Sequence, residues 1–152
     1  MANAFGALVN GGVHVPPRYL LDTHNEAGAV VQPAPAPPAS QVMPRDIADS
    51  VTLAMSGVTD DAGTAPRARQ PFPVYGKTGT TDGSTDAWFI GCVKDPYNLC
   101  MATWMGYEDQ TCAGISGRGC GGMLNIHGVR PVYGGTLPAQ IFARAMAIYR
   151  GA

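Results

Sequence analysis

Charged side chains are scarce in this chain of 152 residues. Asp, Glu, Lys and Arg together make up 14%, the formal net charge is −1, and lysine occurs only twice, as Lys77 and Lys94. No basic stripe is present, which argues against nucleic acid as a partner. No apolar run approaches the ~20 residues of a membrane-spanning helix. The first residues also lack the basic flank and apolar core of a signal peptide.

Metal-binding patterns are missing too. The four cysteines, Cys92, Cys100, Cys112 and Cys120, contain no Cys-x-x-Cys pair, and His127 is the only imidazole near them. This spacing argues against zinc, and nothing indicates another cofactor. Two disulfides fit better: 92–100 across a predicted hairpin, and 112–120 around a glycine-rich loop. Four buried free thiols are the alternative. Disulfides require an oxidising compartment.

Twenty glycines and thirteen prolines predict many turns, and the length allows one domain with a core. The apolar patterns predict helices over 2–9 and 44–58, and strands over 73–80, 86–92 and 99–107. They also predict a small hairpin formed by 19–22 and 29–32, an extended proline-rich connector over 33–38, and a closing helix after Thr136. The fold class is therefore α+β, with an antiparallel sheet and flanking helices.

Two helices carry apolar residues at helical spacing. The 44–58 helix starts behind Pro44, and its apolar positions are Ile47, Val51, Ala54, Met55 and Val58. Thr136 is expected to cap the closing helix. The predicted sheet-facing positions of that helix are Ile141, Phe142, Ala145, Ile148 and Tyr149.

The most informative stretch runs from 74 to 81 and contains Lys77-Thr78-Gly79-Thr80. An extended segment of this kind presents backbone groups, a point positive charge and hydroxyls, while the glycine leaves room for close approach. It suits an anionic, peptide-like ligand lying along the strand. A phosphate-binding loop needs a glycine where Pro71 stands and a helix after the lysine. A surface strand with a solvated lysine remains the other alternative.

The whole pattern resembles the penicillin-binding proteins. Lys-Thr-Gly-Thr-Thr, a short polar turn and Asp86-Ala-Trp-Phe-Ile-Gly91 are similar to the transpeptidase domain of the bifunctional, class A peptidoglycan synthases, in an actinobacterial-like form. Ala4-Phe-Gly-Ala-Leu-Val-Asn-Gly-Gly-Val and the Gly63-Thr-Ala65 turn match the same family. The likeness covers nearly the whole chain apart from 108–133, and implies part of a penicillin-binding-protein/β-lactamase-like transpeptidase fold.

The resemblance also implies roles for individual residues. Lys77 would bring positive charge to the cleft, and Thr78 and Thr80 would bind the terminal carboxylate of the substrate. Gly79 would admit the ligand, and the Thr80 N–H would be one oxyanion donor. Asp86 and Trp88 would be framework residues beside the site. The implied ligand is a peptidoglycan stem peptide ending in D-Ala-D-Ala, or a β-lactam.

The nucleophile of the family is not found in this chain. The family takes its nucleophile and base from the motifs Ser-x-x-Lys and Ser-x-Asn. Neither motif occurs in the sequence, and the nearest approach to Ser-x-Asn is Ser84-Thr85-Asp86. We therefore expect residues 1–152 to be the C-terminal portion of a serine D,D-transpeptidase domain, inactive alone and partnered by the rest of that domain. Its expected location is outside the cytoplasm, at the membrane through an anchor outside this segment. The alternative is a non-catalytic binding or scaffold protein that docks on a cell-wall synthase.

Overall fold

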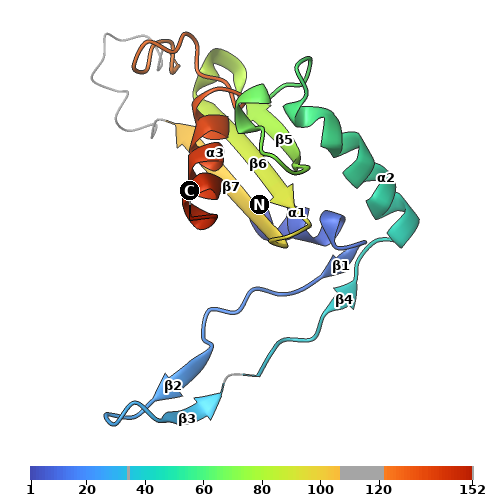
Figure 1. The fold of residues 1–152 in the computed structure, drawn as a ribbon, viewed down its shortest axis with the longest axis vertical. Helices are drawn as coiled ribbons and strands as arrows, with labels where there is room; N and C mark the ends of the chain where they lie inside the picture. The colour runs from blue at the N-terminus through green and yellow to red at the C-terminus, as the bar shows by residue number, and fades with distance from the viewer. Residues whose placement is uncertain (34, 107–121, 152) are drawn as a thin grey trace.

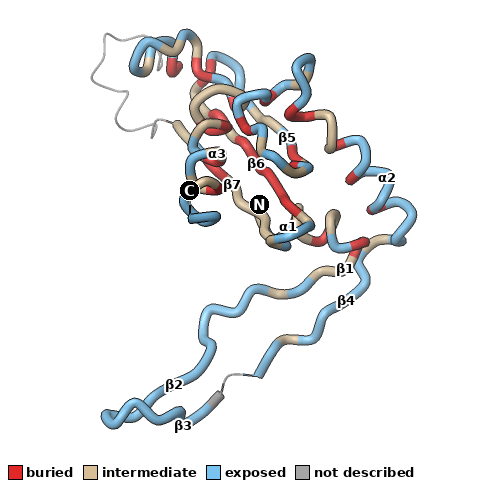
Figure 2. Tube along the Cα trace, in the orientation of Figure 1, coloured by how far each residue is buried: buried red, intermediate tan, exposed pale blue. Residues whose placement is uncertain are grey.

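The fold is centred on a three-stranded antiparallel sheet with the strand order β5-β6-β7. A computed structural model describes residues 1–33, 35–106 and 122–151. The three strands are β5 (Tyr75–Thr80), β6 (Asp86–Val93) and β7 (Leu99–Gly106). They confirm the predicted meander, with the second turn at residues 95–98. The central strand β6 is the most buried of the three (Figures 1 and 2).

Helices cover both faces of this sheet. Strand residues alternate between faces, and Phe89 of β6 packs against Phe142 of α3 (Leu137–Tyr149), with ring centroids 5.1 Å apart. The opposite face carries Cys92 and Cys100, beneath Gly6 of α1 (Ala2–Val9). Helix α2 (Arg45–Met55) lies on the β5 side of the sheet and continues as the 3-10 helix η1 (Ser56–Thr59). Shorter 3-10 helices are η2 (Pro66–Ala68) and η3 (Asp82–Ser84).

A long two-stranded arm projects from this body. Its base is the pair β1 (Val13–His14) and β4 (Ser40–Gln41), and its tip is the pair β2 (Asp22–His24) and β3 (Val30–Pro33). Figure 2 shows the arm almost wholly exposed. The first strand of this hairpin, β2, lies closer to the turn than the predicted 19–22, whereas β3 agrees with the predicted 29–32 to within one residue. The Asn25 side chain accepts hydrogen bonds from Ala27 N and Ala29 N, and this compact turn lets pairing begin at His24.

The predicted apolar faces of both long helices were partly wrong. In α2 the buried residues are Ala48, Thr52 and Met55, whereas Ile47 and Val51 are exposed. The Thr52 hydroxyl donates to Leu8 O of α1 at 3.1 Å, so the face turned inward is the one that meets α1. The helix also ends at Met55, because Ser56–Thr59 tighten into 3-10 geometry.

Helix α3 shows the same kind of difference. It buries Pro138, Ala139, Phe142 and Met146, while Ile141, Ile148 and Tyr149 stay exposed. A helix lying on a sheet buries only a narrow stripe of its side chains, and in α3 that stripe contains Phe142. Thr136 stands at the N-cap without a capping side-chain bond. Its hydroxyl donates to Tyr133 O at 2.7 Å instead and accepts from Tyr133 N.

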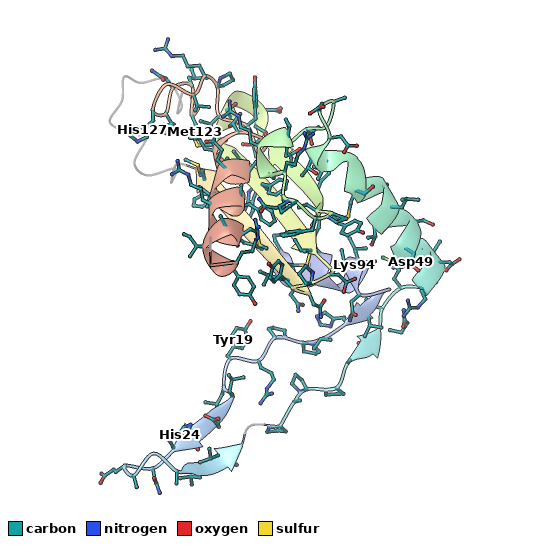
Figure 3. The ribbon with its side chains drawn as sticks, viewed as in Figure 1. Tyr19, His24, Asp49, Lys94, Met123 and His127 are labelled. Atoms are coloured by element: carbon teal, nitrogen blue, oxygen red, sulfur yellow. A yellow bond between two sulfur atoms is a disulfide. The ribbon has the colours of Figure 1, made fainter. Side chains whose placement is uncertain are left out.

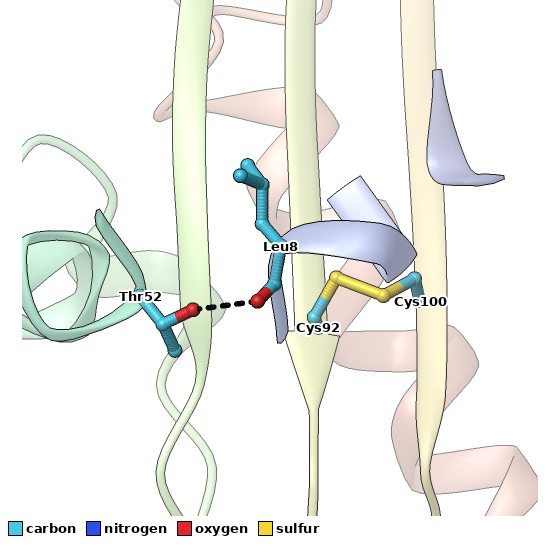
Figure 4. Close-up of a disulfide and its surroundings, with 4 residues drawn as sticks. All are labelled: Leu8, Thr52, Cys92 and Cys100. Atoms are coloured by element: carbon cyan, nitrogen blue, oxygen red, sulfur yellow. Dashed lines mark hydrogen bonds between the residues drawn. A yellow bond between two sulfur atoms is a disulfide. The ribbon is translucent and has the colours of Figure 1, made fainter. Parts of the chain in front are cut away.

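A disulfide joins Cys92 of β6 to Cys100 of β7, as predicted. The two residues are directly paired in the ladder, with Cα atoms 4.1 Å apart. Figure 4 shows Leu8 of α1 between Thr52 of α2 and this disulfide. The predicted 112–120 disulfide lies outside the described residues. Within the described ranges, no helix is both long and apolar enough to cross a membrane.

Candidate functional site

The candidate site is the open edge of β5. β6 pairs with one side of this strand, and no described strand pairs with the other. Lys77 lies opposite Ile90, Thr78 opposite Phe89, and Gly79 opposite Trp88. The sequence-predicted binding residues therefore occupy consecutive positions on an edge strand, where backbone groups are available to a ligand.

The side chains of this edge divide between the two faces of the sheet. Thr78 shares the face of Phe89, which is the face covered by α3. Lys77 and Gly79 lie on the opposite face because successive residues of a strand alternate. A ligand running along the edge would thus meet the ammonium from one side and the hydroxyls from the other.

Lys77 is exposed and is not buried beneath α3. Its Nζ donates to Thr78 O at 2.8 Å, which uses one of the three protons of the ammonium. Within the described residues, the ion pairs are His24–Asp22 and Arg69–Asp61, and neither involves Lys77. The ammonium keeps two donors and has no carboxylate partner among those residues. Its charge is available to an anion.

The two hydroxyls of the motif are held by segments distant in sequence. Thr78 Oγ1 donates to Thr64 Oγ1 at 3.1 Å, and Thr64 belongs to the turn before η2. Thr80 Oγ1 accepts from Gly134 N at 3.1 Å, from the loop before α3. The Gly63-Thr-Ala65 turn was part of the family resemblance, but neither Thr64 nor Gly134 was predicted to belong to the site. Nothing in the local pattern places these loops beside β5.

The two glycines of β5 meet different surroundings. A Cβ atom on Gly76 would lie 2.5 Å from Ile90 O, so the fold itself requires glycine there. A Cβ atom on Gly79 would lie 3.5 Å from Trp88 Cβ, which is an ordinary contact, and φ at Gly79 is not positive. The packing of the described residues therefore does not explain glycine at position 79.

Asp86 and Trp88 lie in a polar and aromatic network beside the motif. Asp86 Oδ1 accepts from Trp104 Nε1 at 2.8 Å, and Asp86 N donates to Thr81 Oγ1 at 2.8 Å. The rings of Trp88 and Trp104 are 6.2 Å apart, on the face that carries Gly79. These bonds tie the ends of the three strands together, and the framework role predicted for Asp86 and Trp88 stays a prediction.

Two cavities among the described residues lie away from β5. Cavities of about 290 and 240 Å³ lie beside α1, and neither is lined by a β5 residue. Lys94, the second lysine, lies at the far end of β6, with Nζ 5.4 Å from the centre of the Tyr75 ring (Figure 3). The candidate site in the described part is therefore the free edge of β5. No described group of histidine, cysteine or acidic residues could hold a metal ion.

An antiparallel sheet between helices, with this polar edge strand, defines a domain of the transpeptidase class. The family model "Penicillin binding protein transpeptidase domain" matches residues 1–116. The chain belongs to this family.

Individual relatives agree with that membership. Penicillin-binding protein 1A of Aquifex aeolicus is 33% identical over 106 residues, which cover 69% of this chain and 14% of the relative. The corresponding protein of Clostridium perfringens is 28% identical, over 71% of this chain and 13% of the relative. The chain thus matches a small part of these relatives.

Solved structures show the same fold. PonA1, a penicillin-binding protein of Mycobacterium tuberculosis, matches with a TM-score of 0.70 and 25% identity over 95% of this chain and 36% of its own. Penicillin-binding protein 3 of the same organism, solved with ampicillin, matches with a TM-score of 0.68 and 20% identity over 99% of this chain and 34% of its own. The class A and actinobacterial-like character expected from the sequence is compatible with these relatives.

Proposed function

We propose that this chain forms the carboxylate-binding edge of a D,D-transpeptidase that cross-links peptidoglycan stem peptides and binds penicillin. Lys77, Thr78, Gly79 and Thr80 are the binding residues, and the Thr80 N–H is one oxyanion donor. The observation that carries the proposal is Gly79: the fold has room for a side chain there, yet the sequence keeps the edge bare. A ligand backbone lying against the strand accounts for that choice.

The charge distribution supports an anionic ligand. Lys77 brings an exposed ammonium without a carboxylate partner among the described residues, and two hydroxyls follow on the same edge. Hydrogen bonds from charged donors to a carboxylate are the stronger kind. The D-alanyl terminus of a stem peptide and the carboxylate of a β-lactam both offer such a group beside a carbonyl.

The nucleophile in this proposal lies outside the 152 residues, because these contain neither Ser-x-x-Lys nor Ser-x-Asn. Residues 1–152 are then the C-terminal portion of the domain, and its remainder is the partner that closes the cleft. The same proposal places the chain outside the cytoplasm, at the membrane through an anchor outside this segment. The Cys92–Cys100 disulfide supports an oxidising location.

Two measurements test this function. First, a fluorescent penicillin should not label the 152-residue chain covalently, and labelling would show that a nucleophile is present after all. Second, benzylpenicillin should bind without a covalent bond and shift the NMR amide signals of residues 77–80. Lys77→Gln should weaken this binding about tenfold or more, because a charge-assisted hydrogen bond is lost.

Lys94→Gln is the matched control, because it removes the only other lysine of the chain, whose Nζ lies over the Tyr75 ring at the first residue of β5 and not at residues 77–80. This variant should bind benzylpenicillin like the unmodified chain. Equal loss in both lysine variants would mean that the ligand senses overall charge and not the β5 edge. Absence of any shift in 77–80 at millimolar ligand would overturn the proposed function.

A further inference from the structure

We propose that Thr64 is a positioning residue, which orients the Thr78 hydroxyl toward the carboxylate of the ligand. This inference rests on the proposed function and deepens it. Thr64 is 14 positions before Thr78, and their hydroxyl oxygens are 3.1 Å apart. Thr64 is the one described side chain that hydrogen-bonds the Thr78 side chain.

The backbone around Thr64 is held in place, although its side chain is exposed. Ala65 is fully buried, and its N–H donates to Val58 O at 2.8 Å. A Cβ atom on Gly63 would lie 2.5 Å from the same carbonyl oxygen, and one on Gly135 would collide with Thr64 O. Two glycines thus allow neighbouring segments to approach this turn closely. The position of the hydroxyl beside β5 is a consequence of that packing.

Thr64 can orient the Thr78 hydroxyl because each of the two hydroxyls has only one proton to donate. Each hydroxyl carries one proton and two lone pairs. In this structure Thr78 donates its proton to Thr64, so that proton does not point toward a ligand. When Thr78 donates to a carboxylate, its lone pair accepts the Thr64 proton, for which no described acceptor competes. The pair then forms a chain of two bonds running toward the anion, and such chains strengthen each bond.

The test is an NMR titration of the 152-residue chain with benzylpenicillin, following the amides of Gly79 and Thr80. Thr64→Val keeps the branched shape but removes the hydroxyl, and should raise the Kd about fivefold, the effect of one neutral hydrogen bond. Thr64→Ser keeps the hydroxyl and should restore the Kd of the unmodified chain. Thr23→Ala, which removes an exposed hydroxyl on the arm, should change nothing.

A second ligand isolates the carboxylate. The methyl ester of benzylpenicillin lacks the negative charge, so Thr64→Val should leave its weaker binding unchanged. A purely structural role for Thr64 would instead affect both ligands alike. An equal loss in the Val and Ser variants, or an effect of the Val variant on the ester as well, would overturn the inference.

Thr78→Val separates this inference from the function on which it rests. If Thr78→Val weakens binding and Thr64→Val does not, the positioning role fails while the binding edge stands. If Thr78→Val also has no effect, the binding role of Thr78 itself is refuted. Unchanged β5 amide signals without ligand verify that each variant is folded.

Discussion

Gly76 and Gly79 are three positions apart in β5, lie on opposite faces of the sheet and meet different surroundings. Gly76 is buried, and a Cβ atom added to it would collide with Ile90 O and press on the Phe89 ring, whereas one added to Gly79 would make an ordinary contact with Trp88. The first glycine is therefore explained by packing, and the second by the proposed ligand. Two substitutions test these two explanations separately.

Gly79→Ala should leave the free energy of unfolding nearly unchanged and weaken benzylpenicillin binding at least about tenfold, because a methyl group would separate the ligand from the strand. Urea unfolding and the NMR titration measure the two effects. Gly76→Ala should instead destabilise the fold by about 1–3 kcal/mol through overpacking. The reverse pattern, with Gly79→Ala unfolding the chain, would assign both glycines to the fold.

At the scale of elements, the Cys92–Cys100 disulfide fixes the β6–β7 hairpin and supports α1. A Cβ atom added to Gly6 would lie 4.0 Å from the Cys100 sulfur, so α1 lies over the disulfide. The Thr52 hydroxyl of α2 donates a hydrogen bond to Leu8 O in the last turn of α1 (Figure 4). The disulfide joins β6 to β7, and Cys92 of β6 is paired on its other side with Tyr75 of β5. The hairpin therefore links the position of α1 to that of the binding strand.

Replacing Cys92 and Cys100 together by serine should lower the free energy of unfolding by about 2–3 kcal/mol, the value for a short closed loop. Urea unfolding of the oxidised chain and of the double variant gives the difference. The amide signals of α1 should also lose protection from hydrogen exchange. Equal stability of the two chains would show that the strand ladder holds the hairpin unaided.

Helix α1 carries a glycine inside its eight residues, and the surroundings leave space for a methyl group. Gly6→Ala should raise the free energy of unfolding by about 0.5–1 kcal/mol, because alanine loses less backbone freedom in a helix. Thermal unfolding followed by circular dichroism measures the gain. A loss of stability would show that α1 packs on the disulfide more tightly than the 4.0 Å contact indicates.

At the scale of the whole molecule, large apolar side chains remain exposed on several elements. They include Leu53 of α2, Trp104 of β7 and Ile148 of α3, with 73%, 46% and 76% of their surface exposed. Exposed apolar side chains beside open sheet edges invite association. The same surfaces would be available to the remainder of the domain, if residues 1–152 are the C-terminal portion that we propose.

The 152-residue chain should therefore self-associate in isolation as its concentration rises, so the NMR titrations are made at the lowest protein concentration that gives a signal. It should also unfold over a broad range of temperature. Sedimentation at increasing protein concentration should show growing assemblies, and Ile148→Glu should reduce them. A monomer that unfolds in one sharp, reversible transition would contradict this expectation.

Local sequence determined the meander, the Cys92–Cys100 pair and the position of Lys77 to Thr80 on an extended strand. Each follows from residues close together in the chain: alternating side chains, a short turn and cysteines at facing ends of neighbouring strands. The resemblance to a known family added the expectation that Lys77, Thr78 and Thr80 bind a ligand. These features need little information about distant segments.

Tertiary structure alone decided which helix faces are buried and which groups hold the motif. The helical spacing of apolar residues does not show which of two adjacent apolar stripes is buried. In the structure, α3 buries Phe142 and Met146 and leaves Ile141 and Ile148 exposed. Thr64 and Gly134 reach the hydroxyls of β5 from 14 and 54 positions away. Such partners depend on how loops pack over the sheet, and no local pattern of residues encodes that contact.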